Sequence, residues 1–339
     1  MRSQLKTTFE DIASMDNLLE AWGEFIKGKR SKKDVQAFGL HLMDNLMDLH
    51  YDLVHRSYQH GPYHAFSISD PKPRSIHKAS VRDRVLHHAI YKKLYPFFDR
   101  TFTSDSYSCR LNKGTHKALK RFRIMMNQVS RSNTQTCWVI KCDIKKFFAS
   151  IDQDIMLYIL STYIPDHDIL WLLERIVKSF STAPNTGLPL GNLTSQLLVN
   201  IYMNEFDQYV KHILKAKHYL RYADDFVLIS DDQEWLEQKI EPISRFLEQC
   251  LHLSLHPRKV SIQTLASGTD FLGWVHFPGH KVLRTTTKRR MKQRIKQSTK
   301  IESLNSYLGL MQHGNTYQLK RQVLSDYWVD SQTGAIRRP

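Results

Sequence analysis

The spacing of apolar residues predicts a largely helical chain that is interrupted by short strands. Through residues 8–60, apolar side chains recur at helical spacing. Another helix is predicted from Val81, and it should stop at Pro96 because proline lacks the backbone N–H that a helix needs. The same periodicity predicts helices over residues 115–130, 153–163, 166–180, 193–216, 233–251 and 305–324.

Short runs rich in β-forming residues lie between these helices. They cover residues 139–143, 218–230, 253–255, 261–263 and 271–277. Residues 66–76 contain Pro71 and Pro73, so we expect an extended arm there from which Lys72 and Arg74 protrude. The mixture of many helices with few strands indicates an α+β fold.

The run at residues 218–230 carries the most informative residues of the chain, Asp224 and Asp225. Apolar β-forming residues flank this polar pair, which predicts a hairpin with both carboxylates at its tip. Another predicted strand ends in Asp143. Adjacent carboxylates repel each other unless cations or solvent screen them, and three of them can hold two divalent metals roughly 4 Å apart for in-line phosphoryl transfer. The pattern therefore indicates a nucleotidyl transferase, although each Asp alone is equally typical of a turn or a strand end.

The charge of the chain agrees with a polyanionic partner. Lys and Arg outnumber Asp and Glu by 49 to 33, which gives a net charge of +16 and a pI near 9.6. Nine Lys or Arg and no acidic residue lie between Lys281 and Lys300. This run favours a nucleic-acid clamp over the alternative of a solvated helix face. The chain has 339 residues, of which 41% are hydrophobic. Because this is longer than one typical domain, we expect two or three subdomains around a shared core.

The cysteines and the N-terminus indicate a cytoplasmic location. The four cysteines have no CxxC spacing and no paired framework, as expected of reduced thiols. The first residues lack a hydrophobic signal core, and no apolar run is long enough for a membrane span. We therefore expect a soluble protein with no membrane partner.

Two further blocks fit the chemistry of a polymerase. After Asp143 the backbone should turn so that Phe148 comes back beneath the active site, where it can stack on an incoming sugar and exclude a 2′-hydroxyl; core packing is the alternative role. The glycines of 187–196 let the backbone approach a base pair closely before a long helix begins. An ordinary loop before a helix is the alternative, but it does not explain the polar residues of this block.

Together these blocks resemble the successive palm motifs of reverse transcriptases. The resemblance is carried by Asp143 with Phe148, by Gly187–Gln196 and by Tyr222-Ala223-Asp224-Asp225. Flanking segments resemble further motifs of the family. Lys72 and Arg74, with residues 105–114, resemble the fingers motifs. Residues 256–259 resemble the motif whose lysine faces the triphosphate, and residues 271–274 resemble the hairpin that grips the primer. The resemblance covers roughly residues 65–325.

Within this family the chain is most similar to the bacterial enzymes of diversity-generating retroelements. Residues 191–196 and the region around Gly314 carry this similarity. In many other members of the family the residue before Gly191 is Gln, whereas this chain has Leu190. The resemblance implies that loss of the Gln side-chain amide reduces fidelity at template adenines. A related bacterial enzyme of antiphage defence is one alternative, and a non-catalytic RNA-binding protein on a polymerase scaffold is another.

The resemblance implies a role for each site residue. Two Mg²⁺ ions, for which Mn²⁺ can substitute, would be held by Asp143, Ile144, Asp224 and Asp225, with Lys259 as a further catalytic residue. The nucleotide would be bound by Lys72, Arg74, Phe148, Leu190, Gly191 and Gln196. Primer and template would be bound by Tyr222, Ala223, Phe271, Leu272, Gly273, Trp274, Lys288, Arg289 and Arg290. The implied partners are a dedicated template RNA, the primer and its cDNA, dNTPs and an accessory protein.

The resemblance also implies a right-hand polymerase with fingers, a palm built on a small antiparallel sheet, and a short helical thumb. We expect a helical N-terminal region at 1–60, fingers at 61–142, a palm at 143–280 that includes a helical segment at 153–186, and a basic thumb at 281–339. No segment is expected to form an RNase H, integrase or endonuclease domain.

Overall fold

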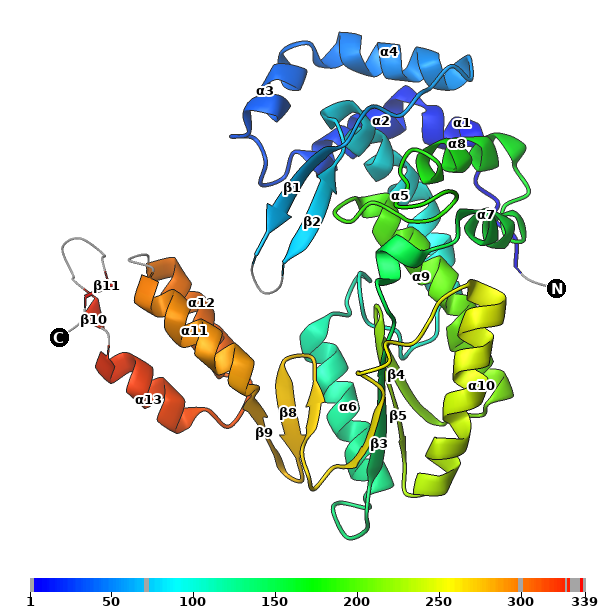
Figure 1. Ribbon diagram of the computed structural model, residues 1–339. Helices are drawn as coiled ribbons and strands as arrows, with labels where there is room; N and C mark the ends of the chain where they lie inside the picture. The colour runs from blue at the N-terminus through cyan, green and yellow to red at the C-terminus, as the bar shows by residue number, and fades with distance from the viewer. Residues whose placement is uncertain (1–2, 70–72, 298–300, 327, 330–335, 338–339) are drawn as a thin grey trace. The chain divides into compact units, whose positions relative to one another are not determined.

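The computed structural model describes residues 3–69, 73–297, 301–326, 328–329 and 336–337, and these form an α+β structure (Figure 1). The helices are α1 (Phe9–Ala13), α2 (Met15–Phe25), α3 (Lys33–Leu40), α4 (Leu42–Val54), α5 (Val81–Thr101), α6 (Thr115–Val129), α7 (Gln153–Ser161), α8 (His167–Val177), α9 (Leu193–Gln208), α10 (Gln233–Leu251), α11 (Thr285–Gln297), α12 (Ile301–Met311) and α13 (Tyr317–Asp326). The strands are β1 (His64–Ile68), β2 (Arg74–Lys78), β3 (Trp138–Asp143), β4 (His218–Tyr222), β5 (Asp225–Ser230), β6 (Ser261–Thr264), β7 (Thr269–Phe271), β8 (Trp274–Phe277), β9 (His280–Leu283), β10 (Trp328–Val329) and β11 (Ile336–Arg337).

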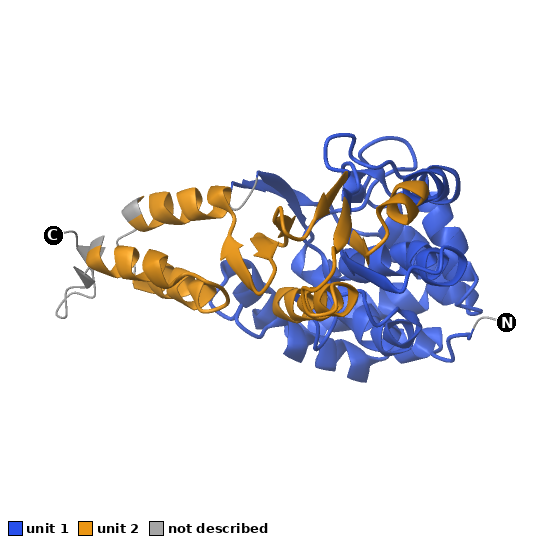
Figure 2. Cartoon of the chain, turned by 90° about the horizontal axis from the view of Figure 1, so that it is seen from below, with its two compact units in different colours: residues 1–114, 142–226, 239–260 blue, residues 115–141, 227–238, 261–339 orange. Residues whose placement is uncertain are grey.

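The chain forms two compact units, each assembled from stretches that are distant in the sequence (Figure 2). Unit 1 comprises residues 1–114, 142–226 and 239–260. Unit 2 comprises residues 115–141, 227–238 and 261–339. None of the helices in the described part of the chain is both long enough and apolar enough to cross a membrane.

Helices form most of unit 1, and α5 is the helix against which others pack. Helix α2 packs on α5 through its buried face, and α9 packs on α5 as well. Ser80 caps α5 by accepting a hydrogen bond from the backbone N–H of Asp83. The prediction that this helix stops at Pro96 was wrong, because α5 continues to Thr101. Burial of Leu94 and Phe98 on either side of the proline offsets the lost hydrogen bond.

The predicted extended arm is an antiparallel hairpin of β1 and β2. Its register pairs His64 with Lys78 and Ile68 with Arg74. The described strands of this hairpin are mostly exposed on both faces. Lys72 lies outside the described residues, in the connection between the two strands.

A four-stranded sheet carries the acidic residues, in the strand order β4-β5-β3-β6. Strands β3 and β6 are antiparallel, and Trp138 pairs with Thr264. The strand predicted at 253–255 was wrong, because the described structure has only one β-bridge there, between Leu255 and Ile144.

Unit 2 also contains the three-stranded sheet β7-β8-β9 and the C-terminal helices. The helix predicted over 305–324 with an interruption at Gly314 is confirmed as α12 and α13. A Cβ atom at Gly314 would lie 2.1 Å from the ring of Trp274, so only glycine fits at this break.

Candidate active site

The predicted hairpin is present, with Ala223 and Asp224 as the residues between β4 and β5. Asp225 is the first residue of β5. Ala223 has a φ of 56°, which is unusual for a residue other than glycine. The carbonyl of Asp224 accepts a hydrogen bond from the backbone N–H of Ile144 (3.2 Å). This bond places Asp224 beside the end of β3, so the sequence prediction that brings it to Asp143 agrees with the structure.

Asp143 ends β3 and is held by the segment that precedes β6. Its backbone carbonyl accepts a hydrogen bond from the N–H of His256 (2.8 Å). Its side-chain Oδ1 accepts one from Lys259 Nζ (2.7 Å), and the Lys259 N–H donates to the carbonyl of His256 (2.9 Å). Asp143 is only 7% exposed, so this ammonium group is its charge partner in a largely desolvated position.

The pKa of Asp224 reflects the charged groups around it. Partial burial raises the pKa of the Asp224 carboxyl, and the negative charge of Asp143 raises it further. The positive charges of Lys259 and Arg74 act in the opposite direction. Two carboxylates thus lie within electrostatic reach of each other and of two cationic side chains.

The residues present fit a hard divalent cation at Asp143 and Asp224. Carboxylate oxygens are preferred Mg²⁺ ligands, and the mutual repulsion of these two groups would be relieved by a cation between them. Among the described residues, however, no three His, Cys, Asp or Glu side chains are grouped as a metal-binding cluster. The fit therefore rests on two carboxylates, and roles for Asp225 and Ile144 stay predictions.

Asp224→Asn is expected to raise the thermal stability of the metal-free protein at neutral pH. The folded-state pKa of Asp224 is raised, so its favourable contribution is complete at low pH and is lost as the pH rises through that pKa. Asparagine cannot ionise and avoids this loss. We expect the difference in Tm, measured in EDTA, to be positive at neutral pH and to shrink towards about pH 4, where an ordinary Asp is half protonated. A lower Tm for the variant throughout would contradict this assignment.

The glycine-containing loop is attached to β2 of the hairpin. The carbonyl of Leu190 accepts a hydrogen bond from the His77 N–H (3.0 Å), and Asn192 Nδ2 donates to the His77 carbonyl (2.9 Å). Gly191 has a φ of +114°, and a Cβ atom there would lie 2.7 Å from Cγ2 of Ile76. Glycine is therefore required on both conformational and steric grounds. Gln196 lies in the first turn of α9 and is partly exposed.

Phe148 lies in a short 3₁₀ turn at Phe147–Ser150. Its backbone carbonyl accepts a hydrogen bond from the Leu188 N–H (2.8 Å), which joins the turn to the glycine-containing loop. Phe147 is buried, whereas the Phe148 side chain is partly exposed. This arrangement argues against the alternative that Phe148 serves only in the core.

The predicted nucleic-acid residues occupy two different places. Tyr222 ends β4, and Ala223 lies in the turn between β4 and β5. In unit 2, Phe271 and Trp274 are buried, whereas Leu272 and Gly273 in the turn between them are partly exposed. The predicted basic contacts, Lys288, Arg289 and Arg290, lie on helix α11 of unit 2. Contact of either element with a primer stays a prediction.

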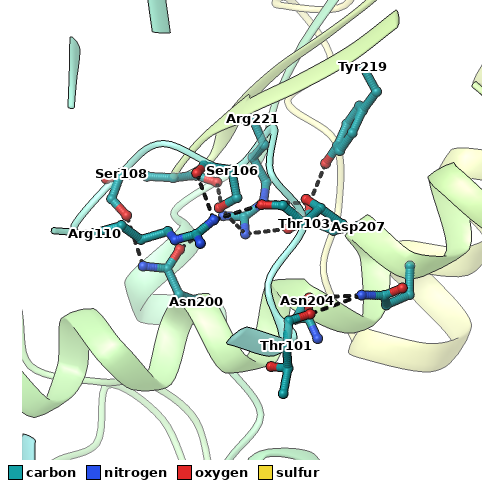
Figure 3. Close-up of polar contacts among 12 residues, drawn as sticks. Thr101, Thr103, Ser106, Ser108, Arg110, Asn200, Asn204, Asp207, Tyr219 and Arg221 are labelled. Carbon is teal, nitrogen blue, oxygen red and sulfur yellow. Dashed lines mark hydrogen bonds and ion pairs between the residues drawn. The ribbon is translucent and has the colours of Figure 1, made fainter. Parts of the chain in front are cut away.

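The sequence analysis missed a fully buried ion pair between Arg221, near the end of β4, and Asp207 of α9 (Figure 3). The available signal was an arginine next to the β-forming pair Tyr219-Leu220, together with an aspartate directly after Phe206 in α9. Such residues are rarely buried without a partner.

Comparison with known proteins assigns the chain to a family. The sequence profile described as reverse transcriptase (RNA-dependent DNA polymerase) matches residues 68–276. Protein YkfC of Escherichia coli K12 is 26% identical over 258 residues, which cover 65% of this chain and 66% of that protein. The group II intron-encoded protein LtrA of Lactococcus lactis is 25% identical over 145 residues, covering 41% of this chain and 23% of LtrA. The putative COX1/OXI3 intron 1 protein of Saccharomyces cerevisiae is 28% identical over 155 residues, covering 42% and 18%.

The chain thus spans about two thirds of YkfC and less than a quarter of each of the two intron proteins. The profile match covers well over half of the chain, and it includes β3, the glycine-containing loop and the hairpin of β4 and β5. This chain therefore belongs to the reverse transcriptase family.

Proposed function

We propose that this chain is an RNA-directed DNA polymerase that copies a dedicated RNA into cDNA by two-metal nucleotidyl transfer. The observation that carries the proposal is the proximity of Asp143 and Asp224 within unit 1, next to Lys259 and under the influence of Arg74. The family membership and the net charge of +16 support a nucleic-acid substrate.

In this proposal Asp143 and Asp224 hold Mg²⁺, together with Ile144, and Asp225 assists from the start of β5. Bound Mg²⁺ would lower the pKa of the primer 3′-hydroxyl and offset the charge of the triphosphate. Arg74, with Lys72, binds the β- and γ-phosphates, for which a guanidinium has suitable bidentate geometry. Lys259 gives a proton to the departing pyrophosphate, a role that its position on Asp143 supports.

The remaining predicted residues bind sugar, base pair and strand. Phe148 packs against the incoming sugar, and its partial exposure supports this role. Leu190, Gly191 and Gln196 face the nascent base pair. The basic helix α11 contacts the nucleic-acid backbone through Lys288 and its neighbours. The division into fingers, palm and thumb belongs to this proposal.

Primer extension on an RNA template tests the proposed reaction. The wild-type protein, Mg²⁺ and a labelled DNA primer would be supplied with either dNTPs or rNTPs. We expect extension with dNTPs and none in EDTA. Extension with rNTPs alone would contradict the proposal, as would a folded protein that binds RNA and makes no product with any dNTP. The latter result would support a non-catalytic RNA-binding role.

We further propose that the enzyme is error-prone and belongs to a diversity-generating retroelement, where it works with an accessory protein. The sequence of residues 191–196 and the presence of Leu190 support this subclass. The Leu190 carbonyl is bound to His77, so its backbone is fixed while an apolar side chain stands where an amide is common in the family.

Leu190→Gln is expected to reduce misincorporation opposite template adenines, by about tenfold if the restored amide contributes one hydrogen bond of ~1.4 kcal/mol. Deep sequencing of cDNA made by both proteins on one template measures this. Leu188→Met, a change at a buried neighbour in the same loop, is the matched control and should leave the error spectrum unchanged. Uniformly low errors in the wild-type product would overturn the subclass proposal.

A further inference from the structure

Strand β4 leads into the turn at Ala223 and Asp224, which is the catalytic turn of the proposed function, and it contains an arginine whose side chain is completely buried. Arg221 and Asp207 are both 0% exposed. Arg221 donates from Nε to Asp207 Oδ1 and from Nη2 to Asp207 Oδ2, each at 2.7 Å. Tyr219 Oη donates to the same carboxylate (2.6 Å). Figure 3 shows this bidentate pair among the polar side chains and backbone groups around it.

The remaining N–H groups of the Arg221 guanidinium also donate hydrogen bonds. Nη1 donates to the carbonyl of Ala223 (3.1 Å) and to Asn200 Oδ1 (3.4 Å), and Nη2 donates to Ser106 Oγ (3.1 Å). An arginine has five N–H donors, and here each of them has an acceptor. The side chain therefore has a single orientation, which is fixed by five separate bonds.

One of these bonds reaches the catalytic turn itself. Ala223 is in the left-handed region, which costs an L-residue other than glycine about 1–2 kcal/mol. Its carbonyl is held by Arg221, and the next carbonyl, that of Asp224, is held by the Ile144 N–H. Strain of this kind persists only where surrounding contacts impose it. Arg221 thus helps to define where the backbone of Asp224 lies.

The other bonds of Arg221 connect this turn to two distant segments of unit 1. Asn200 and Asp207 both belong to α9, the helix that begins at Leu193, two residues after Gly191. Ser106 forms a parallel β-bridge with Arg221, in which the Arg221 N–H donates to the Asp105 carbonyl (2.9 Å). One side chain therefore fixes the catalytic turn relative to the helix behind the nucleotide-binding loop.

Stability alone does not account for an ion pair at this place. Buried ion pairs can often be replaced by apolar side chains of similar volume without loss of stability, because the desolvation penalty offsets the attraction. Apolar residues could not, however, donate to the Ala223 carbonyl. The presence of a buried Arg221–Asp207 pair, in place of apolar residues, is explained if the position of the turn matters for the reaction.

We propose that Arg221 is a positioning residue that holds Asp224 in its reactive place through the Ala223 carbonyl, and that Asp207 orients the guanidinium for this task. The proposal rests on the polymerase function proposed above. It assigns no contact with substrate to either residue.

The double variant Arg221→Met/Asp207→Leu tests this proposal, because it removes the bonds without leaving an unpaired buried charge. We expect it to fold and to bind primed RNA as the wild type does, while kcat for dNTP incorporation falls about 100-fold, the scale of a misplaced reacting group. The KM for dNTP should change little. Arg221→Lys keeps a charge for Asp207 but cannot reproduce the five bonds, and it should also lose kcat.

The matched control is Arg56→Met/Asp168→Leu, which removes another bidentate pair of unit 1 far along the sequence from the turn. It should retain kcat. Hydrogen–deuterium exchange of the peptide spanning 222–228 gives a readout that does not depend on activity, and we expect faster exchange in the Arg221→Met/Asp207→Leu protein only. Unchanged exchange, or unchanged kcat in a folded Arg221→Met/Asp207→Leu protein, would overturn the positioning role. A different outcome would contradict only the polymerase function. In that outcome the wild-type protein is inactive, its 222–228 peptide is protected from exchange, and this protection is lost in the Arg221→Met/Asp207→Leu protein.

Discussion

Asp224→Asn is expected to reduce dNTP incorporation on a primed RNA template by at least about 10²–10³-fold, the usual cost of removing one electrostatic stabiliser from a transition state. The asparagine has nearly the same shape but no charge, so it would hold a divalent cation beside Asp143 much more weakly than the carboxylate. Because the Asp224 pKa is already raised by burial and by Asp143, the neutral side chain should not unfold the site. Single-turnover primer extension at saturating Mg²⁺ measures the effect.

The matched control for this change is Asp44→Asn, on the exposed surface of α4 in unit 1. It makes the same chemical substitution at an acidic residue outside the β4–β5 hairpin and should retain wild-type rates. If Asp224→Asn incorporated dNTPs as fast as Asp44→Asn, Asp224 would have no part in catalysis.

Arg221→Met alone is expected to destabilise the protein by about 3–5 kcal/mol, because it leaves the buried Asp207 carboxylate without its partner. Replacing Asp207 by leucine in the same protein should recover most of this loss. Urea denaturation of the single and double variants measures both free energies of unfolding.

An exposed ion pair provides the comparison for this prediction. Arg245 and Glu241 lie one helical turn apart on α10, with 62% and 66% of their side chains exposed. Arg245→Met should therefore change the free energy of unfolding by no more than about 0.5 kcal/mol. Equal effects of Arg221→Met and Arg245→Met would show that the Asp207 site is not desolvated as the structure has it.

The local elements around the site were predictable from sequence, because they depend on short-range patterns. The Asp224 hairpin follows from two β-forming runs around a polar pair, and the break at Gly314 follows from a glycine inside an apolar periodicity. Helix α10 has the predicted bounds, although Pro242 lies inside it.

The sequence predictions were wrong or incomplete where tertiary contacts outweigh the local conformational preference of the residues. Pro96 does not end α5, because apolar side chains on both sides of it are buried. Residues 253–255 have the composition of a strand, yet only Leu255 forms a bridge. The ion pair of Arg221 with Asp207 joins residues from a strand and a helix, and nothing in the spacing of either residue indicates the other.

The way in which the site residues come together was predictable from the sequence only in part. Asp143 and Asp224 were paired by motif order, and the Ile144–Asp224 hydrogen bond agrees with that pairing. The attachment of Lys259 to the Asp143 side chain, and of His77 to both Leu190 and Asn192, depends on loop conformations that no residue pattern specifies.

The most direct test of the central claim is to sequence the product that the wild-type protein makes from a purified RNA template of known sequence with a DNA primer, dNTPs and Mg²⁺. The account predicts DNA that is complementary to the template, and none from the Asp224→Asn/Asp225→Asn protein. Only untemplated additions, or equal product from both proteins, would contradict a reverse transcriptase centred on Asp143 and Asp224.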